Sequence, residues 1–199
     1  MKREGLTAPP FLTIARFQGN QLAGIQPENG RTGKKRDEEM LHIKVVAVGK
    51  IRDIYWKDAL REYSKRLSPY LRLKLIEVND EPCPERLSAA EEEQLKKREG
   101  ERILKALNTD EYAVLLDVQG KQQDSVSFAR FLADLGMRGQ NNITFIIGGS
   151  LGVSQAVRER SDFSWSFSRL TFTHGLARVM LLEQIYRAVK ISEGGTYHK

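Results

Sequence analysis

The sequence contains a single cysteine, Cys83, and only three histidines among its 199 residues. One cysteine cannot form an internal disulfide, and it lacks the companion ligands that a metal site needs. No run of about 18 apolar residues is present that could cross a membrane. The N-terminal apolar stretch is interrupted by Pro9, Pro10 and Arg16, so it is a poor secretory signal. These absences predict a soluble cytoplasmic protein without a metal centre.

The common phosphate-binding signatures are also missing. The sequence has neither a GxGxxG dinucleotide fingerprint nor a GxxxxGK[ST] loop, which disfavours cofactors such as NAD or ATP. What is present is an excess of basic residues, with a formal net charge of +6. A positive excess favours a polyanionic partner such as RNA, although proteins that bind no nucleic acid also carry charges of this size.

Composition divides the chain into an extension and one domain. Residues 1–39 show no sustained helical or strand period, and they include Pro9, Pro10, Pro27 and the charged run 34–39. This composition predicts a disordered extension, with a basic arm that grips RNA as the alternative. The compact pattern starts after Met40, so residues 40–199 are expected to form a single domain with one core.

Within this domain, strand-like and helix-like segments alternate. Buried strands are expected at residues 41–48, 73–78, 112–118, 143–147 and 163–167. Helices are expected at 53–68, from a capping box at Ser88 to about 107, from a cap at Ser125, from Ser154, and from near His174. Alternation of this kind predicts an α/β fold with a mostly parallel sheet flanked by helices.

The last predicted helix is apolar on more than one side. Between residues 177 and 189 the apolar side chains cover more than the roughly 100° stripe of a surface helix. Such a helix needs cover on two sides, and we expect its own sheet on one and a second copy of the chain on the other. Arg178 and Glu183 also lie in this helix, and either would need a partner if buried.

Three consecutive strands are followed by loops of special composition, at residues 116–120, 148–152 and 167–172. Ligands of parallel sheets collect beyond the carboxyl ends of the strands, where these loops meet. Gly148 and Gly149 lack Cβ atoms, so a flat ligand could lie against their backbone. An ordinary tight turn between strand and helix is the simpler alternative for the two glycines.

The three histidines have different expected surroundings. His42 begins the first strand and is most simply a structural residue. His174 begins the last helix, where the dipole disfavours an imidazolium, so it either stays neutral for a function or caps the chain. His198 lies between Tyr197 and Lys199 at the terminus, where side chains are usually solvated.

Taken together, four segments resemble a known family. They read LLDVQG (115–120), FIIGGSLGVS (145–154), WSFSRLTFTHGLARVMLLEQIYRAVKI (165–191) and the terminal YHK. They are similar to the ribosomal RNA large-subunit methyltransferase H family, a minimal branch of the SPOUT class of knotted methyltransferases, and the similarity runs from Met40 to Lys199. The family usually has proline before the histidine, whereas this chain has Thr173, and Gly175 is also atypical.

The resemblance implies a homodimer with a C-terminal trefoil knot. It also implies S-adenosylmethionine-dependent methylation of N3 of a pseudouridine in the helix 69 loop of bacterial 23S rRNA, on assembled ribosomes. The implied cofactor pocket consists of Leu116, Gly148, Phe167, Ser168, Arg169, Leu170, Thr171 and Phe172.

For the transfer itself, we hypothesise that Arg178 stabilises developing negative charge while Tyr197 or His198 handles the base edge or its proton. Two other functions compete with this one. The basic charge would suit a non-catalytic RNA-binding module. His174 with a phosphate at the glycine turn would suit a hydrolase or transferase, although no nucleophile–base pairing is visible in the sequence.

Overall fold

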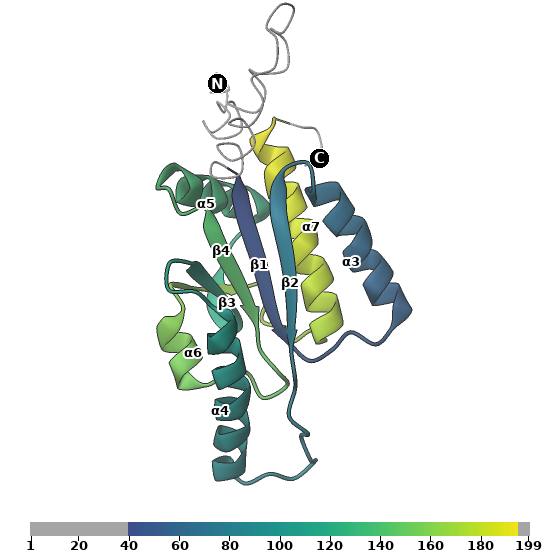
Figure 1. Ribbon diagram of the computed structural model, residues 1–199, viewed down its shortest axis with the longest axis vertical. Helices are drawn as coiled ribbons and strands as arrows, with labels where there is room; N and C mark the ends of the chain where they lie inside the picture. Colours follow the sequence, from purple (N-terminus) through teal and green to yellow (C-terminus); the bar gives the residue numbers. More distant parts are fainter. Residues whose placement is uncertain (1–39, 195–199) are drawn as a thin grey trace, which may run out of the picture.

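The computed structural model describes residues 40–194, so the extension predicted at 1–39 and the terminal Tyr197 and His198 lie outside the described residues. Five strands form one sheet, in which every neighbouring pair is parallel. Figure 1 shows the sheet with its helices around it. Its spatial order is β2 (Leu71–Val78), β1 (Leu41–Val48), β4 (Asn142–Ile147), β3 (Tyr112–Gln122) and β5 (Phe163–Ser166).

Helices cover both faces of the sheet, and each face has its own hydrophobic core (Figure 1). The larger core lies beneath α3 (Ile54–Leu67), α5 (Ser125–Met137) and α7 (His174–Ser192). The smaller core lies beneath α4 (Ala89–Ala106) and α6 (Gln155–Arg160). The α/β class with a parallel sheet flanked by helices, predicted from the alternation of segments, is confirmed.

β1 shows why a continuous apolar run predicted a buried parallel strand. Ile43, Val45 and Ala47 belong to the larger core, whereas Val46 and Val48 belong to the smaller one. Side chains alternate between the two faces of a strand, so a central parallel strand must be apolar at consecutive positions. The amino-terminal half of this strand is the exception, because its smaller-core side carries the polar residues His42 and Lys44.

α7 receives more cover from its own chain than its sequence indicated. It packs on β1 and β4 and lies between α3 and α5, with Leu181, Leu182 and Ile185 wholly buried. Two neighbouring helices therefore cover part of the apolar surface of α7, while Leu176 and Met180 remain partly exposed on it. None of the helices in residues 40–194 is long and apolar enough to span a membrane.

Several local predictions need correction. β3 continues to Gln122, through the residues expected to form a loop, because its second half pairs with β5 beyond a register shift. The cap of α5 is Asp124, whose carboxylate accepts from Ser127 N–H, and not Ser125. The Ser125 hydroxyl instead donates to Gln184 of α7 at 2.9 Å. The capping box at the start of α4 is confirmed.

The start of α7 accommodates both departures from the family pattern. Thr173 has φ −60°, which is the value that proline would impose, although its side chain makes no capping hydrogen bond. Gly175 lies against Trp56 of α3, and a Cβ there would approach the indole Cδ1 to 2.9 Å. Glycine therefore allows the aromatic ring to pack directly on the first turn of α7.

Candidate active site

A cavity of about 400 Å³ opens at the carboxyl edge of the sheet. This volume lies within the range of about 300–1,000 Å³ that small-molecule sites occupy. The three segments predicted as loops converge on it: two of them follow β4 and β5, and the third, residues 116–119, lies within the adjacent strand β3 at its register shift. The lining comprises residues 116–119, 147–153 and 165–172 without Arg169, together with Arg158 and Ala177.

The glycine turn after β4 forms one wall. A Cβ on Gly148 would come within 2.7 Å of Val153 Cγ1 and 3.0 Å of the Gly152 carbonyl oxygen. The turn is closed by a hydrogen bond of 3.0 Å from Gly152 N–H to the Gly149 carbonyl, and Gly152 has φ +87°. The turn is thus too tight for a side chain at Gly148, which leaves backbone groups to face the cavity.

α4 supports this turn from behind. A Cβ on Gly149 would collide with the carboxylate of Glu99, and a Cβ on Gly100 would collide with the hydroxyl of Ser154. Two close approaches therefore fix the turn against one helix. A tight turn with such support is the simpler interpretation of the glycines, and it also gives the cavity a rigid wall.

Glu99 is an unusual component of this support because only 3% of it is exposed. Its Oε1 accepts from the Glu81 N–H at 2.9 Å, whereas its buried Oε2 has no hydrogen-bond partner. Burial raises the pKa of Glu99, and the nearby carboxylates of Asp80 and Glu81 raise it further. The backbone hydrogen bond and Arg102 oppose that shift without cancelling it.

Glu99→Gln is therefore expected to stabilise the protein in a pH-dependent way. The raised pKa of Glu99 means that the folded chain holds a proton that the unfolded chain releases near its ordinary pKa. The stability that this proton contributes is fully present below the pKa of Glu99 in the unfolded chain. It is lost as the pH rises through the pKa of Glu99 in the folded chain. Thermal melts should place the glutamine variant above the parent at pH 8, with the difference vanishing near pH 4.

The matched control is Glu101→Gln, which removes a carboxylate from an exposed position of the same helix. It should give no comparable gain at pH 8, because an exposed charge costs little to keep. A Glu99→Gln variant whose difference from the parent is the same at both pH values would contradict the protonated, buried state.

One ion pair lies at the cavity. Asp117, which follows the core of β3, pairs with Arg158 of α6, and these are the only charged residues in the described lining. The second carboxylate oxygen of Asp117 accepts from Gln119 N–H at 2.9 Å. The pair joins β3 to α6, so it fixes the width of the cavity on that side.

The opposite wall is aromatic and is held by hydroxyl groups. Trp165 stacks on Phe128 with ring centroids 4.0 Å apart, and Phe167 meets it edge-on at 4.8 Å. The Ser166 hydroxyl donates toward the Val118 and Ser168 carbonyls, at 3.2 and 2.8 Å. These contacts shape the chain after β5 into a curved segment that presents backbone groups and apolar side chains to the cavity.

Arg178 lies beside this site without lining it. Its guanidinium is buried and donates to Glu77 Oε1 at 2.8 Å and to the Val48 and Gly49 carbonyls at 2.9 and 2.6 Å. Burial lowers the pKa of Arg178, while Glu77 opposes that shift. Arg178 thereby ties the first turns of α7 to the carboxyl ends of β1 and β2.

His174 is the first residue of α7 and is exposed. Its Nε2 would lie 3.8 Å from a Cβ placed on Gly49, so the ring faces the end of β1. It does not line the cavity. A role for His174 toward a substrate at this edge of the sheet stays a prediction.

The structure brings together most of the residues expected to bind a cofactor. Leu116, Gly148, Phe167, Ser168, Leu170, Thr171 and Phe172 all line the cavity, whereas Arg169 does not. Sequence reasoning missed Arg158, Trp165 and Ala177. Arg158 belongs to a short helix with no periodic signal of its own, and only its pairing with Asp117 identifies it.

Comparison with known proteins identifies the family to which this fold belongs. Residues 41–198 match the family described as "Predicted SPOUT methyltransferase". The chain is 59% identical over 160 residues to Ribosomal RNA large subunit methyltransferase H of Desulfitobacterium hafniense strain Y51, covering 80% of this chain and all of the relative. It is 53% identical over 159 residues to the protein of the same name from Carboxydothermus hydrogenoformans, with the same coverage.

Both relatives align over their full length with 80% of this chain, and the family model matches residues 41–198. The aligned part contains the three loops of the cavity, the supporting helix α4 and the whole of α7. The chain therefore belongs to the ribosomal RNA large subunit methyltransferase H family of SPOUT methyltransferases.

Proposed function

We propose that this protein transfers a methyl group from S-adenosylmethionine to N3 of a pseudouridine in the helix 69 loop of 23S rRNA, in assembled ribosomes of the bacterial cytoplasm. The observation that carries the proposal is the convergence of three loops, with a side-chain-free glycine wall, on one cavity at the carboxyl edge of the sheet. Membership of the methyltransferase family supports the same reaction.

The cavity suits this cofactor in size and in chemistry. The tight turn at Gly148 leaves room for a flat adenine ring, and backbone groups of the loops after β3 and β5 can meet its polar edge. Leu116 and Phe172 supply apolar surface, and the segment 167–172 would surround the remaining part of the molecule. When bound, S-adenosylmethionine supplies a methyl group on a positively charged sulfur.

The protein's remaining tasks are to place the acceptor nitrogen and to handle its proton. Pseudouridine N3 carries a proton near neutral pH, so a base or an anion-stabilising group assists as that proton leaves. We assign contact with the base edge and its proton to Tyr197 and His198, in the terminal segment. Holding the nucleophile in line with the reacting carbon accounts for much of the expected rate.

A second copy of the chain would complete the assembly. Ile54 and Tyr55, at the start of α3, are 73% and 60% exposed, which is high for large apolar side chains. By helical spacing, Leu176 and Met180 lie on the side of α7 away from its buried residues, and both remain partly exposed. We propose that this α3/α7 surface forms the dimer interface and brings one terminal segment toward the partner's cavity.

Transfer of a labelled methyl group to three substrates tests the proposed reaction. The substrates are ribosomes that lack this modification, free large subunits, and naked 23S rRNA. We expect label mainly in assembled ribosomes and at one pseudouridine, because residues 40–194 form a single domain that would read RNA shape and phosphates. Absence of label from all three, with no cofactor binding by calorimetry, would favour the non-catalytic RNA-binding module instead.

A further inference from the structure

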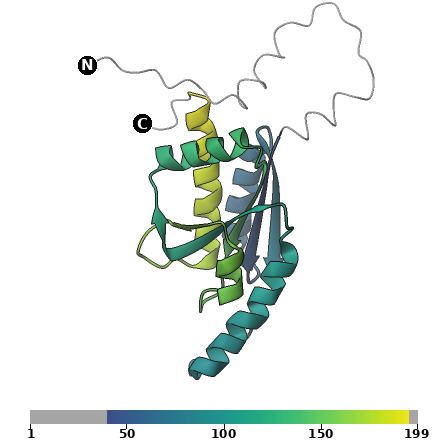
Figure 2. The same ribbon diagram turned by 90° about the vertical axis from the view of Figure 1, so that its left-hand side faces the viewer.

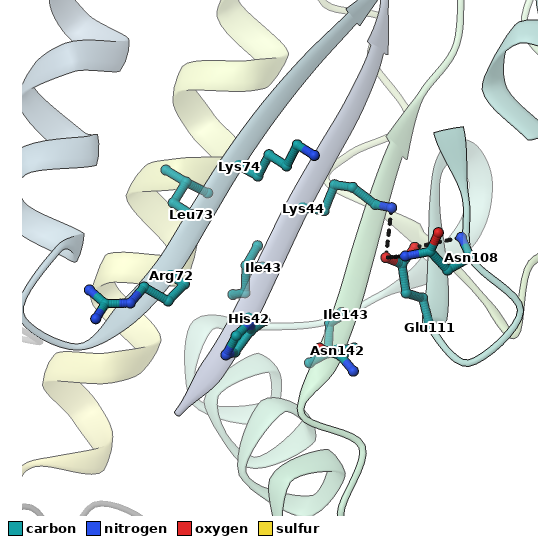
Figure 3. Close-up of a pocket in the computed structure, with 10 residues that line it drawn as sticks. All are labelled: His42, Ile43, Lys44, Arg72, Leu73, Lys74, Asn108, Glu111, Asn142 and Ile143. Atoms are coloured by element: carbon teal, nitrogen blue, oxygen red, sulfur yellow. Dashed lines mark hydrogen bonds and ion pairs between the residues drawn. The ribbon is translucent and has the colours of Figure 1, made fainter. Parts of the chain in front are cut away.

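A second cavity, of about 390 Å³, lies on the sheet at the end opposite the active site (Figure 3). It occupies the amino-terminal halves of β1, β2 and β4, on the face that α4 covers only toward the carboxyl ends (Figures 1 and 2). We name it the basic groove after four of its lining residues, His42, Lys44, Arg72 and Lys74.

The strand register places these four residues in two cross-strand pairs, of which Lys44 and Lys74 carry like charges. His42 lies opposite Arg72, and Lys44 lies opposite Lys74, on neighbouring parallel strands about 4.8 Å apart. Like charges directly opposite each other destabilise a sheet. If this face of the sheet only packed against a helix, it would carry apolar residues, as the carboxyl-terminal half of the same strands does. The Lys44–Lys74 pair therefore calls for a neighbouring charge of opposite sign.

The one acid in the groove does not provide that partner. Glu111 forms an ion pair with Lys44 at 2.6 Å and accepts further bonds from the Thr144 hydroxyl and from both nitrogens of Asn108. Burial pushes the pKa of Glu111 up, but these bonds outweigh it and hold the pKa below its usual value. Its charge is thus matched by Lys44, and it does not neutralise Lys74.

Lys74 is the cation that remains in the groove. Its side chain is exposed, as is that of Arg72, and it has no ion-pair partner within residues 40–194. Glu77 of the same strand cannot serve, because it lies on the other face with Arg178. The lining also contains the amide side chain of Asn142, which adds a neutral hydrogen-bond donor, and the apolar side chains of Ile43, Leu73 and Ile143.

We propose that the basic groove binds backbone phosphates of the ribosomal RNA, as a contact separate from the methyl-transfer site. An extended polyanion fits better than a free phosphate ion, because the groove and the cofactor cavity lie at opposite ends of the eight-residue strand β1. Such a strand spans about 26 Å, and only a large ligand reaches both of its ends. This inference rests on the proposed function, since it takes the same RNA as its ligand.

The test uses the full-length Arg72→Ala/Lys74→Ala double variant. Loss of two solvent-exposed charge contacts to phosphate should raise the KM for ribosomes about tenfold while leaving kcat and the cofactor Kd unchanged. The dependence of binding on salt should also become shallower, by about 0.7–0.9 in log–log slope for each phosphate that the variant no longer neutralises. Lys74→Arg keeps the charge and should restore most of the binding that Lys74→Ala loses.

Lys65→Ala is the matched control, because Lys65 is an exposed lysine of α3 on the other face of the sheet. Filter binding of ribosomes without cofactor reports on the groove even if no methyl transfer occurs, which separates this inference from the proposed reaction. An unchanged KM and salt slope in the double variant would overturn it. Inorganic phosphate that competes at constant ionic strength in the parent alone would reassign the groove to free phosphate.

Discussion

Gly148→Val is expected to weaken S-adenosylmethionine binding by about a hundredfold and to abolish methyl transfer at ordinary cofactor concentrations. A Cβ at this position would already meet Val153 Cγ1 at 2.7 Å and the Gly152 carbonyl at 3.0 Å. A valine must therefore push the turn apart or rotate into the cavity. Binding of the cofactor would then require the turn to return to its parent shape against overpacking of about 3 kcal/mol, which corresponds to the stated loss of affinity.

Calorimetry with S-adenosylmethionine measures this effect directly, and a thermal melt shows whether the variant is folded. Gly139→Asn is a suitable control, because Gly139 has φ +77° with no atom near its missing Cβ, and asparagine tolerates that conformation. The control should bind the cofactor as the parent does. Parent-like affinity in Gly148→Val would show that the cofactor does not lie against this turn.

Gly149→Ala tests the support behind the turn in the same assay. Its methyl group would collide with the Glu99 carboxylate, so the turn or α4 must shift. Removing that carboxylate in Gly149→Ala/Glu99→Ala should recover part of the lost affinity, because the second change creates the missing space. If the double variant binds the cofactor more tightly than the sum of the two single changes predicts, the collision with Glu99 causes the loss. If the two losses simply add, the loss has another origin.

The fold and the location of the active site could be predicted because each depends on short-range patterns. Buried parallel strands are continuous apolar runs, and the loops that follow them must meet at one edge of the sheet. This is why the segments 116–119 and 167–172 can be found from the sequence. The resemblance placed Arg169 in the cofactor pocket with its neighbours. It is the one residue of the segment 167–172 that does not line the cavity.

Contacts between distant segments could not be predicted in this way. Nothing in the sequence joins Arg178 to Glu77, or Lys44 to Glu111, because their proximity depends on strand order and register. The cover of α7 by α3 and α5 has the same origin, so the sequence could not separate the sides that these helices cover from a side open to a second copy. The trefoil knot was implied only by the resemblance and stays a prediction, since no residue spacing indicates threading.

Arg178→Ala is expected to destabilise the protein by about 3 kcal/mol. The change leaves Glu77 without its cation and the Val48 and Gly49 carbonyls without their buried donor. For a domain of this size, that loss lowers the melting temperature by about 10 °C. Arg61→Ala removes the arginine of an exposed pair with Asp58 and should change stability by less than about 1 kcal/mol.

Melting curves alone do not reveal whether Arg178 also stabilises charge during methyl transfer, so turnover is measured well below the melting temperature of each variant. Its three hydrogen bonds hold the first turns of α7 against β1 and β2, so Arg178 is a positioning residue. Folded Arg178→Ala should then keep the parent's cofactor Kd and lose turnover through misplacement of α7.

His198→Ala should lose turnover with an unchanged melting temperature, because its expected role concerns only the substrate. Parent-like stability in Arg178→Ala would contradict the buried anchor, and parent-like turnover would remove Arg178 from the mechanism.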